Sequence, residues 1–129
     1  MVINCSTVEH VGLIGRYDVA EDRPDGDLEA MALLRRLLKP GGRMVLTIPL
    51  GQDAVFAPLC RVYGAERLPR LLQGYEVEKE SYWVKDEGNR WAPCDRRAAC
   101  DFKASAGSWD ALQNIYALGG FVLRRPKER

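Results

Sequence analysis

The sequence predicts an α/β domain, and three observations lead to this fold class. A helix is predicted over residues 28–39, where apolar side chains recur at spacings of three and four. Residues 43–49 follow as a largely apolar run, typical of a strand buried on both faces. The apolar run that opens residues 1–6 predicts the end of another strand. Strand, helix and strand in this order predict two neighbouring parallel strands joined by a crossover.

Both ends of the central helix are marked in the sequence. Asp27 is predicted as its N-cap, because a short carboxylate side chain can accept the first unpaired backbone amides of a helix. Basic residues fill its last turns, where cations suit the helix dipole. Pro40, Gly41 and Gly42 then end it, since glycine accepts the left-handed backbone that a helix C-terminus needs.

The later elements follow from shorter patterns. Residues 65–73 predict a short helix that ends at Gly74, and residues 75–85, rich in aromatic and β-branched side chains, predict a long strand. Residues 91–107 are predicted to be irregular.

The C-terminal part predicts one more helix and one more strand. Ser108 is placed to cap a helix over residues 108–118, which Gly119 and Gly120 would end. Residues 121–124 then predict the last strand.

Length and composition limit the possible classes of protein. The 129 residues form a single domain, 47% hydrophobic and 29% charged, which excludes a disordered chain. The net charge of +1 argues against nucleic acid as a general ligand. Neither a membrane span nor a signal peptide is predicted, so we expect a cytoplasmic protein.

The cysteines do not predict a metal site. Cys5, Cys60, Cys94 and Cys100 are scattered, without a C-x-x-C pair, and His10 is the one histidine of the chain. A zinc site usually needs two close pairs of ligands. We therefore expect no metal and four reduced thiols.

Two stretches resemble the class I S-adenosylmethionine-dependent methyltransferases. Residues 37–49, Leu-Leu-Lys-Pro-Gly-Gly followed by an apolar strand, are similar to the helix, turn and fifth strand of that family. Residues 3–11, with the stretch Glu-His-Val, are similar to its fourth strand and the turn after it. Residues 12–17 and 61–63 further resemble a poorly characterised methyltransferase-like subgroup.

The resemblance covers the family's C-terminal half only. It implies that residues 1–129 form part of a Rossmann-like methyltransferase sheet, with parallel strands and a C-terminal antiparallel pair, and that the N-terminal strands are missing. The family's glycine-rich G-x-G-x-G turn, which lets the backbone approach the cofactor, has no counterpart in this sequence.

The function that the resemblance implies is methyl transfer from S-adenosylmethionine to a nucleophile on a small molecule, glycan or lipid. The chain would be an enzyme if a missing N-terminal half or a partner completed it. The alternative is a non-catalytic binding or assembly domain that keeps the scaffold without a complete cofactor site.

Asn4, Cys5 and Ser6 are the predicted cofactor-binding residues. They follow the first apolar run, and ligands of open α/β sheets bind at the carboxyl ends of the strands. The resemblance implies that they line the methionine end of the cofactor. The alternative is an ordinary strand end that turns into a capped helix.

His10 is the predicted catalytic residue. An imidazole can accept a proton from a substrate hydroxyl or amine near neutral pH. The alternative is a structural hydrogen bond.

Arg16, Tyr17, Arg61 and Tyr63 are the predicted substrate-binding residues. They lie on two loops that follow the two strand ends, so they could frame one cleft, and arginine suits an anionic or sugar-phosphate substrate. Packing between loops is the alternative.

The first strand also predicts an association. With no preceding strand, it would keep an edge of unpaired amides and carbonyls, which favours pairing with another chain. We therefore expect a homo-oligomer such as a dimer, or a partner that supplies the missing strands.

Overall fold

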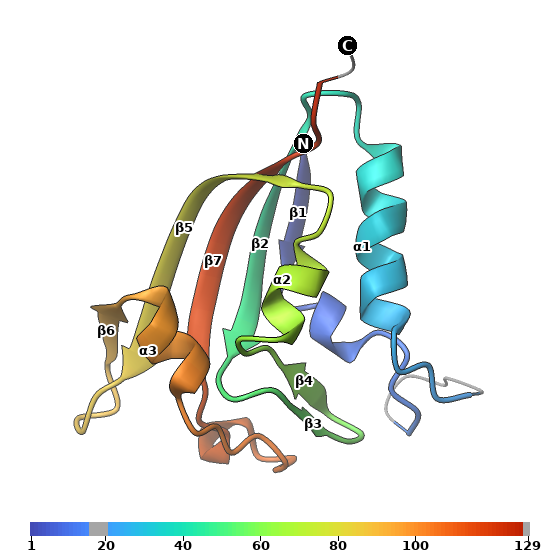
Figure 1. Cartoon of the computed structure of the whole chain (residues 1–129). Coiled ribbons are helices and arrows are strands. Elements are labelled where there is room, and N and C mark those ends of the chain that lie inside the picture. Colours follow the sequence, from blue (N-terminus) through green and yellow to red (C-terminus); the bar gives the residue numbers. More distant parts are fainter. Residues whose placement is uncertain (16–20, 128–129) are drawn as a thin grey trace.

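A computed structural model describes residues 1–15 and 21–127 and shows a mixed α/β fold (Figure 1). Its main sheet has the strand order β1-β2-β7-β5-β6. The bounds are Val2–Cys5 for β1, Arg43–Leu50 for β2, Ala117–Arg124 for β7, Glu76–Lys85 for β5 and Trp91–Cys94 for β6. A separate two-stranded sheet joins β3, Ala54–Phe56, to β4, Cys60–Val62.

The predicted parallel pair is confirmed. β1 runs parallel to β2, with a register from Val2 opposite Met44 to Cys5 opposite Thr47. Helix α1, Gly26–Leu37, lies between them in the chain, after the single 3₁₀ turn η1, Val8–His10. All other pairs of the main sheet are antiparallel. The sheet is therefore mostly antiparallel, with one parallel pair at its end.

One face of the sheet carries the core. The buried side chains of β2 that alternate along the strand, Met44, Leu46 and Ile48, pack in one cluster with α1, with α2 (Arg67–Leu71) and with α3 (Arg96–Asp101). Figure 1 shows α2 and α3 in front of the sheet, with α1 beside β1. Because all three helices share one cluster with these strand residues, they cover the same face of the sheet.

The predicted N-cap at Asp27 is wrong. The helix begins at Gly26, two residues earlier than predicted, its N-cap position is Asp25, and the Asp27 side chain is fully buried. Asp27 accepts hydrogen bonds from Tyr63 and Arg67, which lie 36 and 40 residues further along the chain. A local pattern could not reveal partners at that distance. Gly41, with φ of +76°, does take the left-handed backbone expected after the helix.

The predicted helix over residues 108–118 is also wrong. The structure has a single 3₁₀ turn there, η2 (Ala111–Gln113), and β7 begins at Ala117. Gly119 and Gly120 lie inside β7 rather than at a helix end. A Cβ atom on Gly119 would come within 2.7 Å of Leu50 and 2.9 Å of Phe121, so the glycine lets its neighbours pack close to the strand.

The segment predicted to be irregular contains β6 and α3. Asp95 caps α3 by accepting a 2.8 Å hydrogen bond from the Ala98 amide. The predicted long strand and the short helix before it are confirmed as β5 and α2, and Gly74, with φ of +84°, follows that helix. Among the described helices, none combines the length and the apolar character needed to cross a membrane.

Candidate functional site

The carboxyl ends of the two parallel strands bring two hydroxyl side chains together. Ser6 directly follows β1, and its amide donates to the Thr47 carbonyl at 2.9 Å and to Thr47 Oγ1 at 3.1 Å. The two hydroxyl oxygens lie 3.4 Å apart. Thr47 lies opposite Cys5 in the sheet, so this pair closes the parallel ladder at the edge where open α/β sheets bind ligands.

Ser6 holds an unusual backbone conformation. Its φ is +47°, in the left-handed region that residues with a Cβ rarely adopt. This turn is held by the Thr47 contacts and by Thr7, whose hydroxyl donates to the Cys5 carbonyl at 2.9 Å. The turn ends the strand sharply and leads the chain into η1, which carries His10.

His10 lies just beyond this turn with its side chain 20% exposed. Its Nδ1 contacts the Leu59 carbonyl, and its Nε2 lies 3.7 Å from Oε1 of the buried Glu9. Because a carbonyl oxygen can only accept, the contact requires the proton on Nδ1. The neutral ring then carries its basic lone pair on Nε2, and Glu9 can stabilise the ring once it is protonated.

Tyr116 and Cys60 belong to the same surroundings. Burial raises the pKa of the Tyr116 hydroxyl, and the Cys60 thiol and the Glu9 carboxylate raise it further. The hydroxyl therefore stays protonated near Glu9 across the physiological range. The sequence pattern does not single out Tyr116, because it places this residue in the helix predicted over residues 108–118. In the structure, the segment before β7 sets Tyr116 beside the β3–β4 hairpin.

Arg61 lies in the interior rather than on an open cleft wall. It is 1% exposed, and its guanidinium donates to backbone carbonyls of the loop before α1, at 2.9 Å to Arg23 and 3.5 Å to Pro24. It also donates to the Val11 carbonyl. These contacts favour loop packing, the alternative that the sequence left open for this residue.

Tyr63 is part of the same interior network. Its hydroxyl donates a 2.9 Å hydrogen bond to Asp27 Oδ2, and Arg67 donates to both Asp27 oxygens at 2.9 Å. Burial and the adjacent Asp27 carboxylate raise the pKa of the Tyr63 hydroxyl far above its usual value. Arg61 Nε lies 3.8 Å from Asp27, so Tyr63 and Arg61 meet at one buried carboxylate.

The other predicted site residues lie in different surroundings. Asn4 is buried, and its amide nitrogen lies 3.8 Å from the Met31 sulfur and 4.0 Å from the Met44 sulfur, so it points under α1. Cys5 is exposed at the strand end. Arg16 and Tyr17 lie outside the described residues. Of the predicted set, the carboxyl edge thus holds Cys5 and Ser6, with His10 on the turn that follows.

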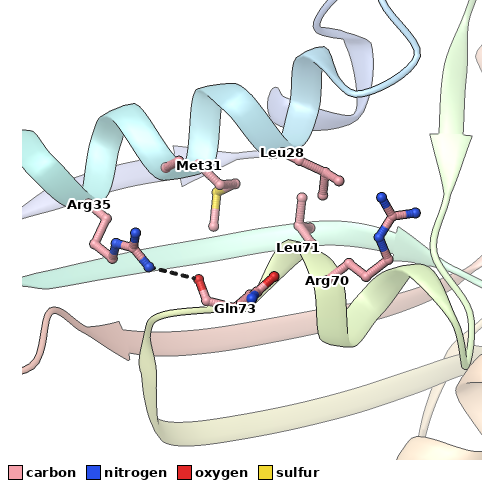
Figure 2. A pocket seen from close by; sticks show the side chains of 7 residues that line it. Leu28, Met31, Arg35, Arg70, Leu71 and Gln73 are labelled. Atoms are coloured by element: carbon pink, nitrogen blue, oxygen red, sulfur yellow. Dashed lines mark hydrogen bonds between the residues drawn. The ribbon is translucent and has the colours of Figure 1, made fainter.

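A hollow lies between α1 and α2 (Figure 2). Its volume is about 210 Å³, and Figure 2 shows Leu28, Met31 and Leu71 along it, with two arginines at its ends. Arg35 donates to the Gln73 carbonyl at 3.2 Å, and Arg70 lies 3.7 Å from Asp25. Both guanidinium groups are thus held by the chain itself, and none of the predicted site residues lines this hollow.

The described residues contain no group of three or more His, Cys, Asp or Glu side chains placed to hold a metal ion. None of the four cysteines forms a disulfide bond in the described part of the chain, and Cys60 and Cys100 are buried.

Comparison with known proteins identifies the family. A comparison with curated proteins gave no match. The model of the family described as "Caenorhabditis protein of unknown function, DUF268" matches residues 1–89. The matched part includes β1, α1, β2 and the turn that carries His10. Because the match spans well over half of the 129 residues, the chain belongs to the DUF268 family.

Proposed function

We propose that this chain is a methyltransferase-like protein that uses S-adenosylmethionine and transfers a methyl group to a nucleophile on a small molecule, glycan or lipid. The observation that carries the proposal is the parallel pairing of β1 with β2 across α1, which sets Ser6 and Thr47 at one carboxyl edge next to His10. The antiparallel pairing of β5 with β7 supports it, because the resemblance implies a final antiparallel pair.

The residues at this edge fit one part of the cofactor. Ser6 and Thr47 offer hydroxyl groups that donate and accept, which suits the ammonium and carboxylate of a methionine moiety. The sequence holds no G-x-G-x-G turn for the nucleotide part. The proposal therefore includes completion of the site by further strands, from an N-terminal half or from a partner.

His10 has the geometry of a general base. When bound, S-adenosylmethionine supplies an electrophilic methyl group on its sulfonium. The contact with the Leu59 carbonyl fixes the imidazole ring, and the role that we propose for Nε2 is to take the proton that a substrate hydroxyl or amine loses. Glu9 Oε1, 3.7 Å from Nε2, stabilises the imidazolium that results.

Calorimetric titration of the chain with S-adenosylmethionine tests the proposal. We expect this chain alone to bind the methionine moiety of S-adenosylmethionine, with an affinity that Thr47→Val lowers several-fold, because the change removes the hydroxyl and keeps the shape of the side chain. Ser81→Ala is the matched control, since this exposed hydroxyl lies two strands away on β5. No binding by the wild-type chain, or equal binding by wild type and Thr47→Val, would contradict the proposed site.

A second candidate is a non-catalytic binding or assembly domain that keeps this scaffold. The outer edge of β1 favours it, because β1 pairs with β2 alone among the described residues. The same titration separates the candidates, since an assembly domain would not require S-adenosylmethionine.

A further inference from the structure

The hollow between α1 and α2 has an apolar middle, formed by Leu28, Met31 and Leu71 (Figure 2). Met31 and Leu71 belong to the packed core of the molecule, so the middle offers a firm apolar surface. The volume of about 210 Å³ is smaller than the roughly 300–1,000 Å³ that sites for drug-sized ligands have. The hollow therefore suits a small molecule with an apolar body.

Arg35, at one end of the hollow, has no carboxylate partner among the described residues. Its guanidinium donates to the neutral Gln73 carbonyl at 3.2 Å. A guanidinium carries five N–H donors, so most of its donors remain for a ligand. The planar arrangement of these donors matches the oxygens of a carboxylate or a phosphate.

Gly74 makes room for the Arg35 guanidinium. The glycine follows α2 with φ of +84°, and a Cβ atom at this position would coincide with the guanidinium of Arg35. The charged group therefore lies against the backbone of this turn, where the Gln73 carbonyl holds it. A side chain that is already held in place loses less conformational entropy when a ligand binds to it.

Arg70, at the other end, differs from Arg35. Its guanidinium lies 3.7 Å from the Asp25 carboxylate, and both side chains are more than half exposed. The charge of Arg70 is thus met by a carboxylate of the chain and screened by water. The two ends of the hollow are therefore not equivalent, and the positive charge without a carboxylate partner lies at the Arg35 end.

We propose that this hollow binds a small amphipathic anion, whose carboxylate or phosphate group contacts Arg35 and whose hydrocarbon part lies on the apolar middle. Leu28 and Arg35 both line the hollow and are two turns of helix apart, about 10 Å, so a short hydrocarbon chain can extend between them. Charge selects the head group, and the apolar middle selects the body. The inference does not rest on the proposed methyl transfer, because none of the residues at the carboxyl edge lines this hollow.

Calorimetric titration of the full chain with octanoate and with octyl phosphate tests the site. We expect at least one of these anions to bind with a dissociation constant of about 1 mM or lower, a range that a ligand of this size can reach. Octanol, which has the same hydrocarbon chain without a charge, should bind at least tenfold more weakly. The preference between octanoate and octyl phosphate identifies the head group.

Three variants locate the binding site. Arg35→Gln removes the charge at one end and should weaken binding of the anion at least fivefold. Ala32→Leu fills part of the hollow without changing the charge and should weaken binding by a similar factor, and the exposed position of Ala32 keeps the fold intact. Arg36→Gln is the matched control, because Arg36 is the next residue of α1, is exposed and does not line the hollow. It makes the same change in net charge and should bind like the wild type.

Two sets of results are decisive. Weaker binding by both Arg35→Gln and Ala32→Leu, with Arg36→Gln unchanged, supports the site, and far-UV circular dichroism checks that all variants are folded. The proposal is overturned if the wild type binds neither anion, if Arg35→Gln and Arg36→Gln bind equally, or if octanol binds as tightly as the anions. S-adenosylmethionine binding measured on the same samples reports on the proposed function separately.

Discussion

The Tyr63 hydroxyl donates a 2.9 Å hydrogen bond to the Asp27 carboxylate, and both side chains are fully buried. Arg67 donates to the same carboxylate, and Arg61 approaches it to 3.8 Å. This network joins the first turn of α1 to β4 and α2. Arg61 also donates to the Glu9 and Val11 carbonyls, which lie on either side of His10, so the network holds the segment that carries His10.

Asp27→Asn should destabilise the fold more than Tyr63→Phe. The first change leaves the buried Arg61 guanidinium and the partly exposed Arg67 guanidinium without their carboxylate, at a cost of about 3–5 kcal/mol. The second removes one hydrogen bond to a charged group, at a cost of about 1.5–3 kcal/mol. Urea denaturation measures both free energies of unfolding. Equal losses, or a larger loss for Tyr63→Phe, would show that the carboxylate is not the centre of the network.

The two neighbouring glycines of β7 should respond differently to alanine. A Cβ on Gly119 would meet Leu50 at 2.7 Å and Phe121 at 2.9 Å, both in the core, so Gly119→Ala should cost about 1–3 kcal/mol. A Cβ on Gly120 would meet Trp83 at 3.4 Å, an ordinary contact. Gly120→Ala should change the stability by less than about 0.5 kcal/mol. Thermal unfolding of the two variants measures both losses of stability. Losses of similar size would contradict the strand assignment of these glycines.

The parallel unit could be predicted from the sequence because its signals are local. The apolar spacing of α1, the glycines after it and the apolar run of β2 lie within one stretch of chain. β7 could not be predicted in full, since its first residues also fit a helical pattern. Its pairing with β2 and β5 decides the outcome. The nearest end of β2 lies 67 residues before the start of β7, and that of β5 lies 32 residues before it.

The candidate site shows the same limit. The position of Ser6 and His10 after the first strand follows from local order, and the structure brings both to the carboxyl edge. The interior positions of Arg61 and Tyr63 depend on carbonyls and a carboxylate of the loop before α1 and of its first turn. Residue type alone does not distinguish an arginine that binds substrate from one that holds a loop.

Ser6→Gly should be more stable than Ser6→Ala by about 1 kcal/mol, because only glycine adopts a φ of +47° without strain. Both variants lose the hydroxyl whose oxygen lies 3.4 Å from Thr47 Oγ1. The difference in stability between them therefore reports the backbone strain of the positive φ at residue 6. Urea denaturation of the two variants gives the difference. If Ser6→Ala is as stable as Ser6→Gly, the left-handed turn at the end of β1 is not present in solution.

The stability of the fold should fall as the pH rises from 10 to 12. Burial raises the pKa of Tyr75 to about 12 and that of Tyr82 to about 12, and the Tyr75 hydroxyl donates to the Met31 carbonyl at 2.6 Å. In the unfolded chain both groups ionise near pH 10. Between about pH 10 and 12 the unfolded state therefore binds fewer protons than the native state, and the free energy of unfolding falls. This stabilisation is complete below pH 10 and is lost as the pH approaches 12. Urea midpoints measured across this range should decline in the wild type and decline less in the double variant Tyr75→Phe with Tyr82→Phe, because these two hydroxyls are then absent. A decline of the same size in the double variant would show that these two hydroxyls do not cause it.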